Sequence, residues 1–239
     1  MGIAQSPDVM TAVPAPAVPP ELRVGGLTPL TTVDYPGELA AVVFCQGCPW
    51  RCRYCHNGHL LPPRAPGQIP WAEVRAFLHS RRGLLDAVVF SGGEPTLQPA
   101  LGAAMTEARA LGFKVGLHTS GAFPARLKPL LPLLDWVGLD IKALPADYPA
   151  ITGVPGSGER AWASLALLLE AGVALQVRTT PMPGRDSPAE LERLRERLVA
   201  LGVRDHRVQR CRTEHTLDPS LAAPSTARPF TAGSAVDAT

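Results

Sequence analysis

Cysteine is the residue type whose spacing in this sequence most clearly supports chemistry. Four of the five cysteines, Cys45, Cys48, Cys52 and Cys55, lie close together, and Cys211 stands alone. Such bunching is unlike a disulfide framework, and the first residues, MGIAQSPDVM, lack the basic start and apolar run of a secretory signal. We therefore expect a reducing, cytoplasmic location, where clustered thiols indicate metal or redox chemistry.

The spacing Cys48-x3-Cys52-x2-Cys55 discriminates between kinds of metal site. Three thiolates on one short loop can hold three corners of a [4Fe–4S] cube and leave one iron open to a small molecule. A zinc site built from two CxxC pairs normally has about 15–20 residues between the pairs. A ferredoxin-type cluster with four protein ligands needs the order C-x2-C-x2-C-x3-C. Both alternatives therefore fit this spacing less well.

Two cysteines fall outside the informative spacing. Cys45 ends a predicted buried strand, where the role of a small apolar residue is expected rather than ligation or redox exchange. Cys211 is interpreted as a packed or partly exposed thiol. The predicted metal ligands are therefore Cys48, Cys52 and Cys55.

Short apolar runs alternate with longer segments of helical periodicity, which predicts an α/β fold. Strands separated by helices form a mostly parallel sheet with the helices outside, and their carboxyl ends meet at one edge. A full eight-stranded barrel takes about 250 residues, so we expect a partial (β/α)6 barrel. The expected strands are Leu39–Phe44, Ala87–Phe90, Phe113–Leu117, Trp136–Asp140, Val173–Arg178 and His206–Arg210, and the expected helices are Trp71–His79, Gln98–Leu111, Arg160–Ala171, Ala189–Leu201 and a weaker, proline-interrupted Pro124–Leu134.

Composition divides the chain into three parts. Residues 1–21 contain a Pro/Ala-rich stretch that predicts a disordered leader, residues 22–211 form the folded domain, and residues 212–239 are expected to be a loosely ordered tail. The net charge of +2 and the 18% of charged residues do not suggest a nucleic-acid partner. The sequence has no run of 18 apolar residues, so no membrane span is expected.

Polar residues follow the predicted strands at the edge where a ligand should lie. Gly92 and Gly93 allow the backbone to approach a ligand closely, and Glu94 can accept hydrogen bonds from an ammonium group. A simple turn and a solvated surface remain the ordinary explanations for such residues. Further candidates at strand ends are Thr119 and Ser120, Asp140 and Lys142, and Arg178.

The motifs FCQGCPWRCRYCHN, SGGEP, HTSG, LDIK and VRTTPMP together resemble those of a known superfamily. The CxxxCxxC spacing, with the aromatic Tyr54 before its last cysteine, resembles that of the radical S-adenosylmethionine (radical SAM) superfamily. The order of the motifs is similar to that of glycyl-radical-enzyme activating enzymes, above all the anaerobic ribonucleoside-triphosphate reductase activating proteins. The resemblance runs from about Gly26 to Arg210 and includes the approach segment LTPLTTVDYPGELAAVVF.

This resemblance implies one [4Fe–4S] cluster and S-adenosylmethionine (SAM) as cofactors, with no catalytic residue beyond them. It implies that the GGE motif and Tyr54 contact the cofactors and that Lys142 or Arg178 pairs with the SAM carboxylate. The implied partners are a glycyl-radical enzyme and reduced flavodoxin or ferredoxin as electron donor. Two alternatives stay open: a radical SAM enzyme acting on a small molecule, similar to 7-carboxy-7-deazaguanine synthase, and a non-catalytic iron–sulfur or zinc protein.

One departure from the family pattern concerns the third strand. In related activating enzymes this strand ends in Asp-Thr-Asn-Gly, and its Asp joins the Asp of the fourth strand in holding a monovalent cation. Here His118 and Ser120 stand in that motif, although Asp140 remains. Because a neutral imidazole is a poor ligand for such a cation, we do not expect this cation site to be intact.

Overall fold

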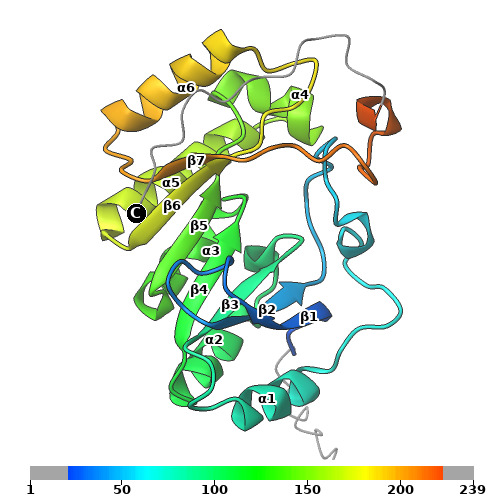
Figure 1. The fold of residues 1–239 in the computed structure, drawn as a ribbon, viewed down its shortest axis with the longest axis vertical. Coiled ribbons are helices and arrows are strands. Elements are labelled where there is room, and N and C mark those ends of the chain that lie inside the picture. The colour runs from blue at the N-terminus through cyan, green and yellow to red at the C-terminus, as the bar shows by residue number, and fades with distance from the viewer. Residues whose placement is uncertain (1–20, 223–239) are drawn as a thin grey trace, which may run out of the picture.

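The computed structural model describes residues 21–222, which form one seven-stranded sheet (Figure 1). The strands follow one another across the sheet in chain order, from β1 to β7. The first two strands are antiparallel, and every later neighbour is parallel. The strands are β1 (Val24–Thr31), β2 (Ala40–Cys45), β3 (Ala87–Gly92), β4 (Lys114–Thr119), β5 (Trp136–Asp140), β6 (Ala174–Thr179) and β7 (His206–Val208).

The helices of the described residues lie outside the curved sheet (Figure 1). Proline explains why the segment between β4 and β5 is only partly helical, because Pro132 lies within it and lacks a backbone donor. That segment forms α3 and then a 3-10 turn over Lys128–Leu133, as its proline content predicts. The α-helices are α1 (Trp71–Ser80), α2 (Leu101–Ala110), α3 (Pro124–Leu127), α4 (Tyr148–Thr152), α5 (Ser157–Ala171) and α6 (Pro188–Ala200).

The predicted fold class is confirmed: the sheet is mostly parallel, its helices lie outside, and it does not close into a full barrel. The six predicted strands correspond to β2 through β7, and β7 ends two residues earlier than expected. The additional strand β1 precedes the repeats and pairs with β2 as a hairpin. The expected leader lies outside the described residues except for Glu21, and the expected tail lies outside them beyond residue 222.

The two faces of the sheet have different cores. The larger apolar core lies between the sheet and the helices. On the opposite, concave face, a smaller cluster contains Tyr35, Val42, Val89 and Trp136. Tyr35 comes from the β1–β2 turn, and its ring centroid lies 5.2 Å from that of Trp136. This cluster fills the part of the concave face below the strands' carboxyl ends, so the open space lies at those ends.

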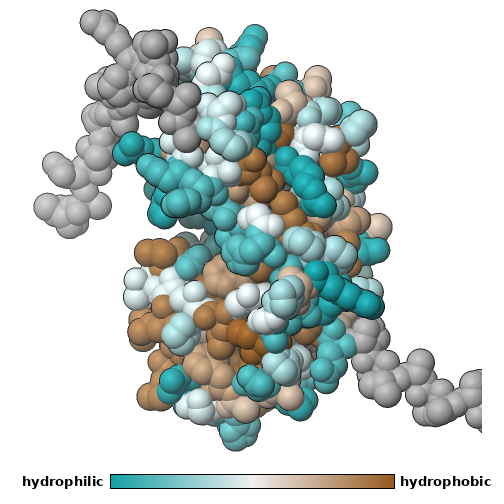
Figure 2. Space-filling model, turned by 90° about the vertical axis from the view of Figure 1, so that its right-hand side faces the viewer, coloured by the Kyte–Doolittle hydropathy of each residue, from teal (hydrophilic) through white to brown (hydrophobic). Residues whose placement is uncertain are grey.

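The molecular surface has apolar and polar regions. Figure 2 shows one face on which apolar residues gather mainly in the lower half, with hydrophilic residues along its upper and right-hand parts. Large apolar side chains that are exposed include Leu30, Val33, Leu39 and Leu84. Within residues 21–222, no helix has both the length and the apolar character needed to cross a membrane.

Candidate active site

The cysteine loop, residues 46–61, follows β2 and is anchored on two sides. At the first side, the buried Gln46 amide donates hydrogen bonds to the carbonyls of His59 (3.0 Å) and Pro62 (2.8 Å). At the second side, two backbone N–H groups of the loop donate to carbonyls at the end of α4. The loop is therefore held in place by the fold itself.

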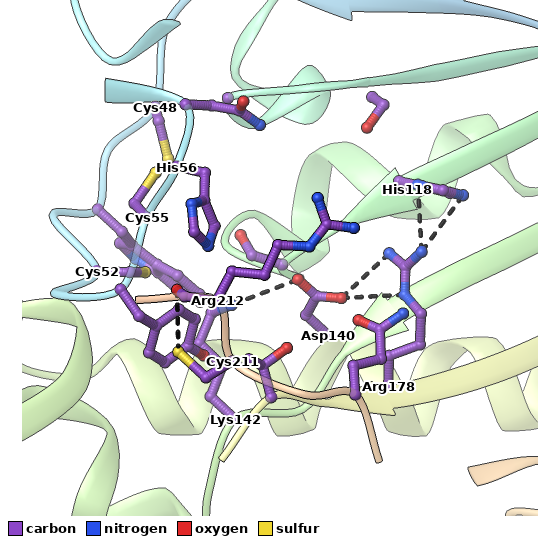
Figure 3. A pocket seen from close by; sticks show the side chains of 18 of the residues that line it. Cys48, Cys52, Cys55, His56, His118, Asp140, Lys142, Arg178, Cys211 and Arg212 are labelled. Atoms are coloured by element: carbon purple, nitrogen blue, oxygen red, sulfur yellow. Dashed lines mark hydrogen bonds and ion pairs between the residues drawn. The ribbon is translucent and has the colours of Figure 1, made fainter. Parts of the chain in front are cut away.

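The thiols of Cys48, Cys52 and Cys55 all line one cavity of about 940 Å³ at the carboxyl ends of the strands (Figure 3). Cys45 is completely buried and belongs to the apolar core. Burial raises the pKa of Cys48 to about 12 and also raises the pKa of Cys52. Thiolates at these positions therefore need a positively charged metal group to stabilise them.

The donor set fits a cluster better than a single ion. Among residues 21–222, no three His, Cys, Asp or Glu side chains lie close enough together to hold one metal ion. A tetrahedral zinc ion would need its ligands within about 2.0–2.3 Å of one point. Three thiols from one loop that line one cavity suit three corners of a four-iron cluster. Tyr54 lines the same cavity beside Lys142. Its buried hydroxyl makes no hydrogen bond of ordinary geometry among the described residues, so a bound group can supply a partner.

The glycine turn after β3 packs directly against the cysteine loop. A Cβ atom on Gly93 would lie 2.3 Å from the carbonyl oxygen of Gly47, and one on Gly92 would lie 2.4 Å from the backbone nitrogen of Cys45. Gly92 also has a φ of +116°. The two glycines therefore permit a close approach of backbone to backbone, while both still line the cavity.

The Glu94 carboxylate does not line the cavity. It is completely buried and accepts hydrogen bonds from the hydroxyls of Thr96 (2.6 Å), Thr119 (2.8 Å) and Ser120 (2.5 Å). Backbone N–H groups of Thr96 and Ser120 donate to the same carboxylate. Glu94 thus ties the glycine turn to the end of β4, and its contact with an ammonium group stays a prediction.

Asp140 lies at the centre of a charged network at the ends of β5 and β6 (Figure 3). Its carboxylate is 3.4 Å from Lys142 Nζ and 3.1 Å from Arg178 Nη2. Burial alone raises the pKa of Asp140, but Lys142 and Arg178 outweigh it and leave the pKa below its ordinary value. Burial lowers the pKa of Lys142, and its neighbours, including Tyr54 and Asp140, raise it well above its ordinary value. Lys142 therefore stays charged beside Asp140.

The segment after β7 contributes residues to the cavity that the sequence analysis did not predict. Residues 209–214 line it, including Cys211, which was interpreted as an ordinary thiol. Three contacts hold the following residues on the cysteine loop. Arg53 Nε lies 2.7 Å from Asp218 Oδ2, the Leu217 N–H donates to Cys55 O at 3.1 Å, and the Asp218 N–H donates to Arg53 O at 2.9 Å. In Figure 1 this segment runs from β7 back to the loop. The signal that could have found it is polar residues directly after a parallel strand.

The predicted site residues otherwise come together as expected from their positions at strand ends. The predicted metal ligands and cofactor contacts that line this one cavity are Cys48, Cys52, Cys55, Tyr54, Gly92, Gly93, Thr119, Ser120, Asp140, Lys142 and Arg178.

Comparisons with known sequences identify related proteins. The profile of the Radical SAM superfamily matches residues 42–198. A protein of Methanocaldococcus jannaschii, named as a glycyl-radical enzyme activating enzyme, is 32% identical over 168 residues, which cover 67% of this chain and 68% of that protein. The pyruvate formate-lyase-activating enzyme of Clostridium pasteurianum is 31% identical over 168 residues, which cover 67% of this chain and 69% of that enzyme.

Solved structures support the fold. Streptococcus suis SuiB bound to S-adenosylmethionine superposes with a TM-score of 0.57 at 17% identity, covering 72% of this chain and 40% of that chain. The structure of anSMEcpe with bound AdoMet gives a TM-score of 0.58 at 15% identity, covering 74% of this chain and 54% of that chain. The chain thus spans about half or less of the length of these structural neighbours.

The open parallel sheet, with three loop thiols and a charged network at its carboxyl edge, defines an α/β protein built around a metal-cluster cavity. Because the superfamily profile matches more than half of the chain, this protein belongs to the radical SAM superfamily. Its homologues include glycyl-radical enzyme activating enzymes. Membership implies a [4Fe–4S] cluster and SAM as cofactors, as the sequence predicted.

Proposed function

We propose that this protein activates a glycyl-radical enzyme, and that its partner is anaerobic ribonucleoside-triphosphate reductase. The observation that carries the proposal is the single cavity that combines three thiols of a CxxxCxxC loop with a charged network, in a chain homologous to activating enzymes. The choice of the reductase as partner rests on the approach segment TTVDYPG and the CHN ending of the cysteine motif.

When bound, the cluster and SAM supply one-electron cleavage of the sulfonium carbon–sulfur bond, which gives methionine and a 5′-deoxyadenosyl radical that takes a hydrogen atom from a glycine of the partner. The electron is proposed to come from reduced flavodoxin or ferredoxin. The chain itself binds and orients these groups and keeps them apart from solvent.

Individual residues are assigned to binding the cluster and SAM. Cys48, Cys52 and Cys55 would hold three irons of the cluster and leave the fourth for SAM. Lys142 and Arg178 carry positive charge in the same cavity and are suited to the SAM carboxylate. The segment 209–214 forms another wall of the cavity and reduces its contact with water.

The test uses the full chain, reconstituted with iron and sulfide under anaerobic conditions, reduced and mixed with SAM. Anaerobic ribonucleotide reductase and pyruvate formate-lyase are offered in separate reactions, each with a matched variant in which the radical-bearing glycine is replaced by alanine. We expect a glycyl signal by electron paramagnetic resonance (EPR) with the reductase and little with the lyase, and 5′-deoxyadenosine as co-product.

The outcomes separate the alternatives. A signal with the lyase alone would contradict the choice of partner but keep the activity. Formation of 5′-deoxyadenosine with no glycyl signal on either partner would favour a small-molecule substrate. A fully loaded protein that does not cleave SAM would contradict the enzymatic proposal.

A further inference from the structure

The Arg178 side chain is tightly packed on the concave face of the sheet. Its side chain crosses β5 at Gly138, where a Cβ atom would lie 3.1 Å from the guanidinium carbon. Its Nε and Nη2 atoms lie 3.2 Å and 3.1 Å from Asp140 Oδ1, and only 13% of the side chain is exposed. Gly138 and Asp140 thus hold the guanidinium from below and from one side.

His118 holds the guanidinium from the other side. The Nη1 atom of Arg178 lies 3.2 Å from His118 Nδ1 and 3.4 Å from Nε2 (Figure 3). The Nε2 atom is also 2.8 Å from the backbone carbonyl oxygen of Asp34 in the β1–β2 turn. Because a carbonyl oxygen only accepts hydrogen bonds, Nε2 must carry the proton. Nη1 lies almost equally far from the two ring nitrogens, so it faces the ring between them, and only the unprotonated Nδ1 can accept from it.

The surroundings keep this imidazole neutral and fixed. Burial, and then the charge of Arg178, lower the pKa of His118 to about 4. The ring stands edge-on to Trp136, with centroids 5.4 Å apart. The ring thus has one contact to Asp34, through Nε2, and one to the Arg178 guanidinium.

We propose that His118 is a positioning residue for the cofactor cavity: anchored on the Asp34 carbonyl, its neutral ring holds the Arg178 guanidinium against Asp140. The cavity thereby carries a cation whose location is set by the chain. The inference deepens the proposed function and rests on it in one respect, because the group that Arg178 meets in the cavity is taken to be SAM.

Three variants at position 118 separate positioning from a merely structural role. His118→Ala removes both contacts. His118→Asn replaces Nδ1 with an acceptor that can reach Arg178 but has no donor at the Nε2 position. His118→Gln keeps a donor near the Nε2 position, for the Asp34 carbonyl, and loses the acceptor for Arg178.

The readouts are the apparent SAM affinity, from the change that SAM causes in the EPR spectrum of the reduced cluster, and KM and kcat for 5′-deoxyadenosine formation. We expect His118→Ala to weaken SAM binding about tenfold, because Arg178 loses the neutral partner that holds its guanidinium beside Asp140. His118→Asn should restore most of this loss, whereas His118→Gln should not. The effect should be larger on KM than on kcat.

The reverse order, with Gln restoring function and Asn not, would mean that His118 only ties the turn to β4, and would overturn the proposal. Equal losses in both variants would overturn it as well. Nitrogen-15 NMR of the wild-type imidazole gives an independent readout: the Nε2–H tautomer is expected near pH 7, with the Nδ1 resonance shifting in Arg178→Gln. An Nδ1–H tautomer would contradict the positioning role of His118, whether or not SAM binds. A wild-type protein that neither binds nor cleaves SAM would contradict only the proposed function.

Discussion

The cysteine loop and the charged network around Asp140 line the same cavity but differ in how far the protein itself supplies their partners. In the network, Asp140 contacts two cations, and the neighbouring Glu94 carboxylate, buried outside the cavity, accepts hydrogen bonds from three side-chain hydroxyls. In the loop, burial raises the pKa of Cys48 and Cys52, and the Tyr54 hydroxyl lacks a partner among the described residues. The chain itself therefore supplies the partners of the polar groups in the network, whereas the loop needs a bound group to supply them.

The largest effect is expected where the loop meets that group. Cys48→Ala should lose the cluster and reduce 5′-deoxyadenosine formation to background, because it removes one of the three predicted thiolate ligands and two are too few to hold the cluster. Cys45→Ala is the matched control, since this thiol is buried in the core, and it should keep the cluster at a cost of about 1 kcal/mol in stability. Iron content and product yield check both. Loss of the cluster in both variants would contradict the ligand assignment.

The contact between the two regions predicts the next largest effect. Gly93→Ala should lower the free energy of unfolding by about 3 kcal/mol, because its Cβ atom would lie 2.3 Å from the Gly47 carbonyl oxygen. At Gly26 the nearest atom would lie at 3.6 Å, so Gly26→Ala should change stability by less than about 0.5 kcal/mol. Urea denaturation measures both. Equal stability of the two variants would show that the glycine turn and the loop are not held together tightly.

A substitution at Tyr54 tests whether the loop needs a bound group. Tyr54→Phe removes a buried hydroxyl without a partner, so we expect unchanged or higher stability and SAM binding weakened about tenfold, near 1.4 kcal/mol. Tyr148→Phe is the control, because the Tyr148 hydroxyl accepts a hydrogen bond from the Lys142 N–H at 2.9 Å and should cost about 1 kcal/mol of stability. Denaturation and EPR titration with SAM measure these effects. A destabilised Tyr54→Phe protein would mean that the hydroxyl already has a partner.

The smallest expected effect comes from the completed network. The pKa of His118 is lowered to about 4, so the unfolded chain binds a proton that the folded chain does not when the pH lies between about 4 and 6.5. Stability should therefore fall as the pH falls through this window. Between pH 7 and 5.5 the wild type should lose about 1 kcal/mol more than His118→Gln. Parallel slopes of stability against pH for the two proteins would contradict a buried, neutral His118.

The strands and helices of the fold could be predicted from the sequence because they depend on local patterns of apolar residues. Apolar runs and helical spacing located β2 through β7 closely, since β2 through β5 are largely buried on both faces and the helices present one apolar face. The C-terminal segment was not predictable in this way. Its position over the cysteine loop depends on Arg53 and on residues around Asp218, which are far apart in the chain. Glu94 is a similar case, because its partners on β4 become neighbours only when the strands pair.

By itself, the sequence determined the ligand spacing of the three thiols and the parallel sheet that places polar residues at one edge, since both follow from spacing along the chain. Only the tertiary structure decided which way those polar residues point. It directed Glu94 into a buried hydrogen-bond network, brought residues 209–214 into the cavity wall, and placed His118 between a turn carbonyl and Arg178. Pairing between strands that are distant in the sequence set these directions, and a local motif does not contain that pairing.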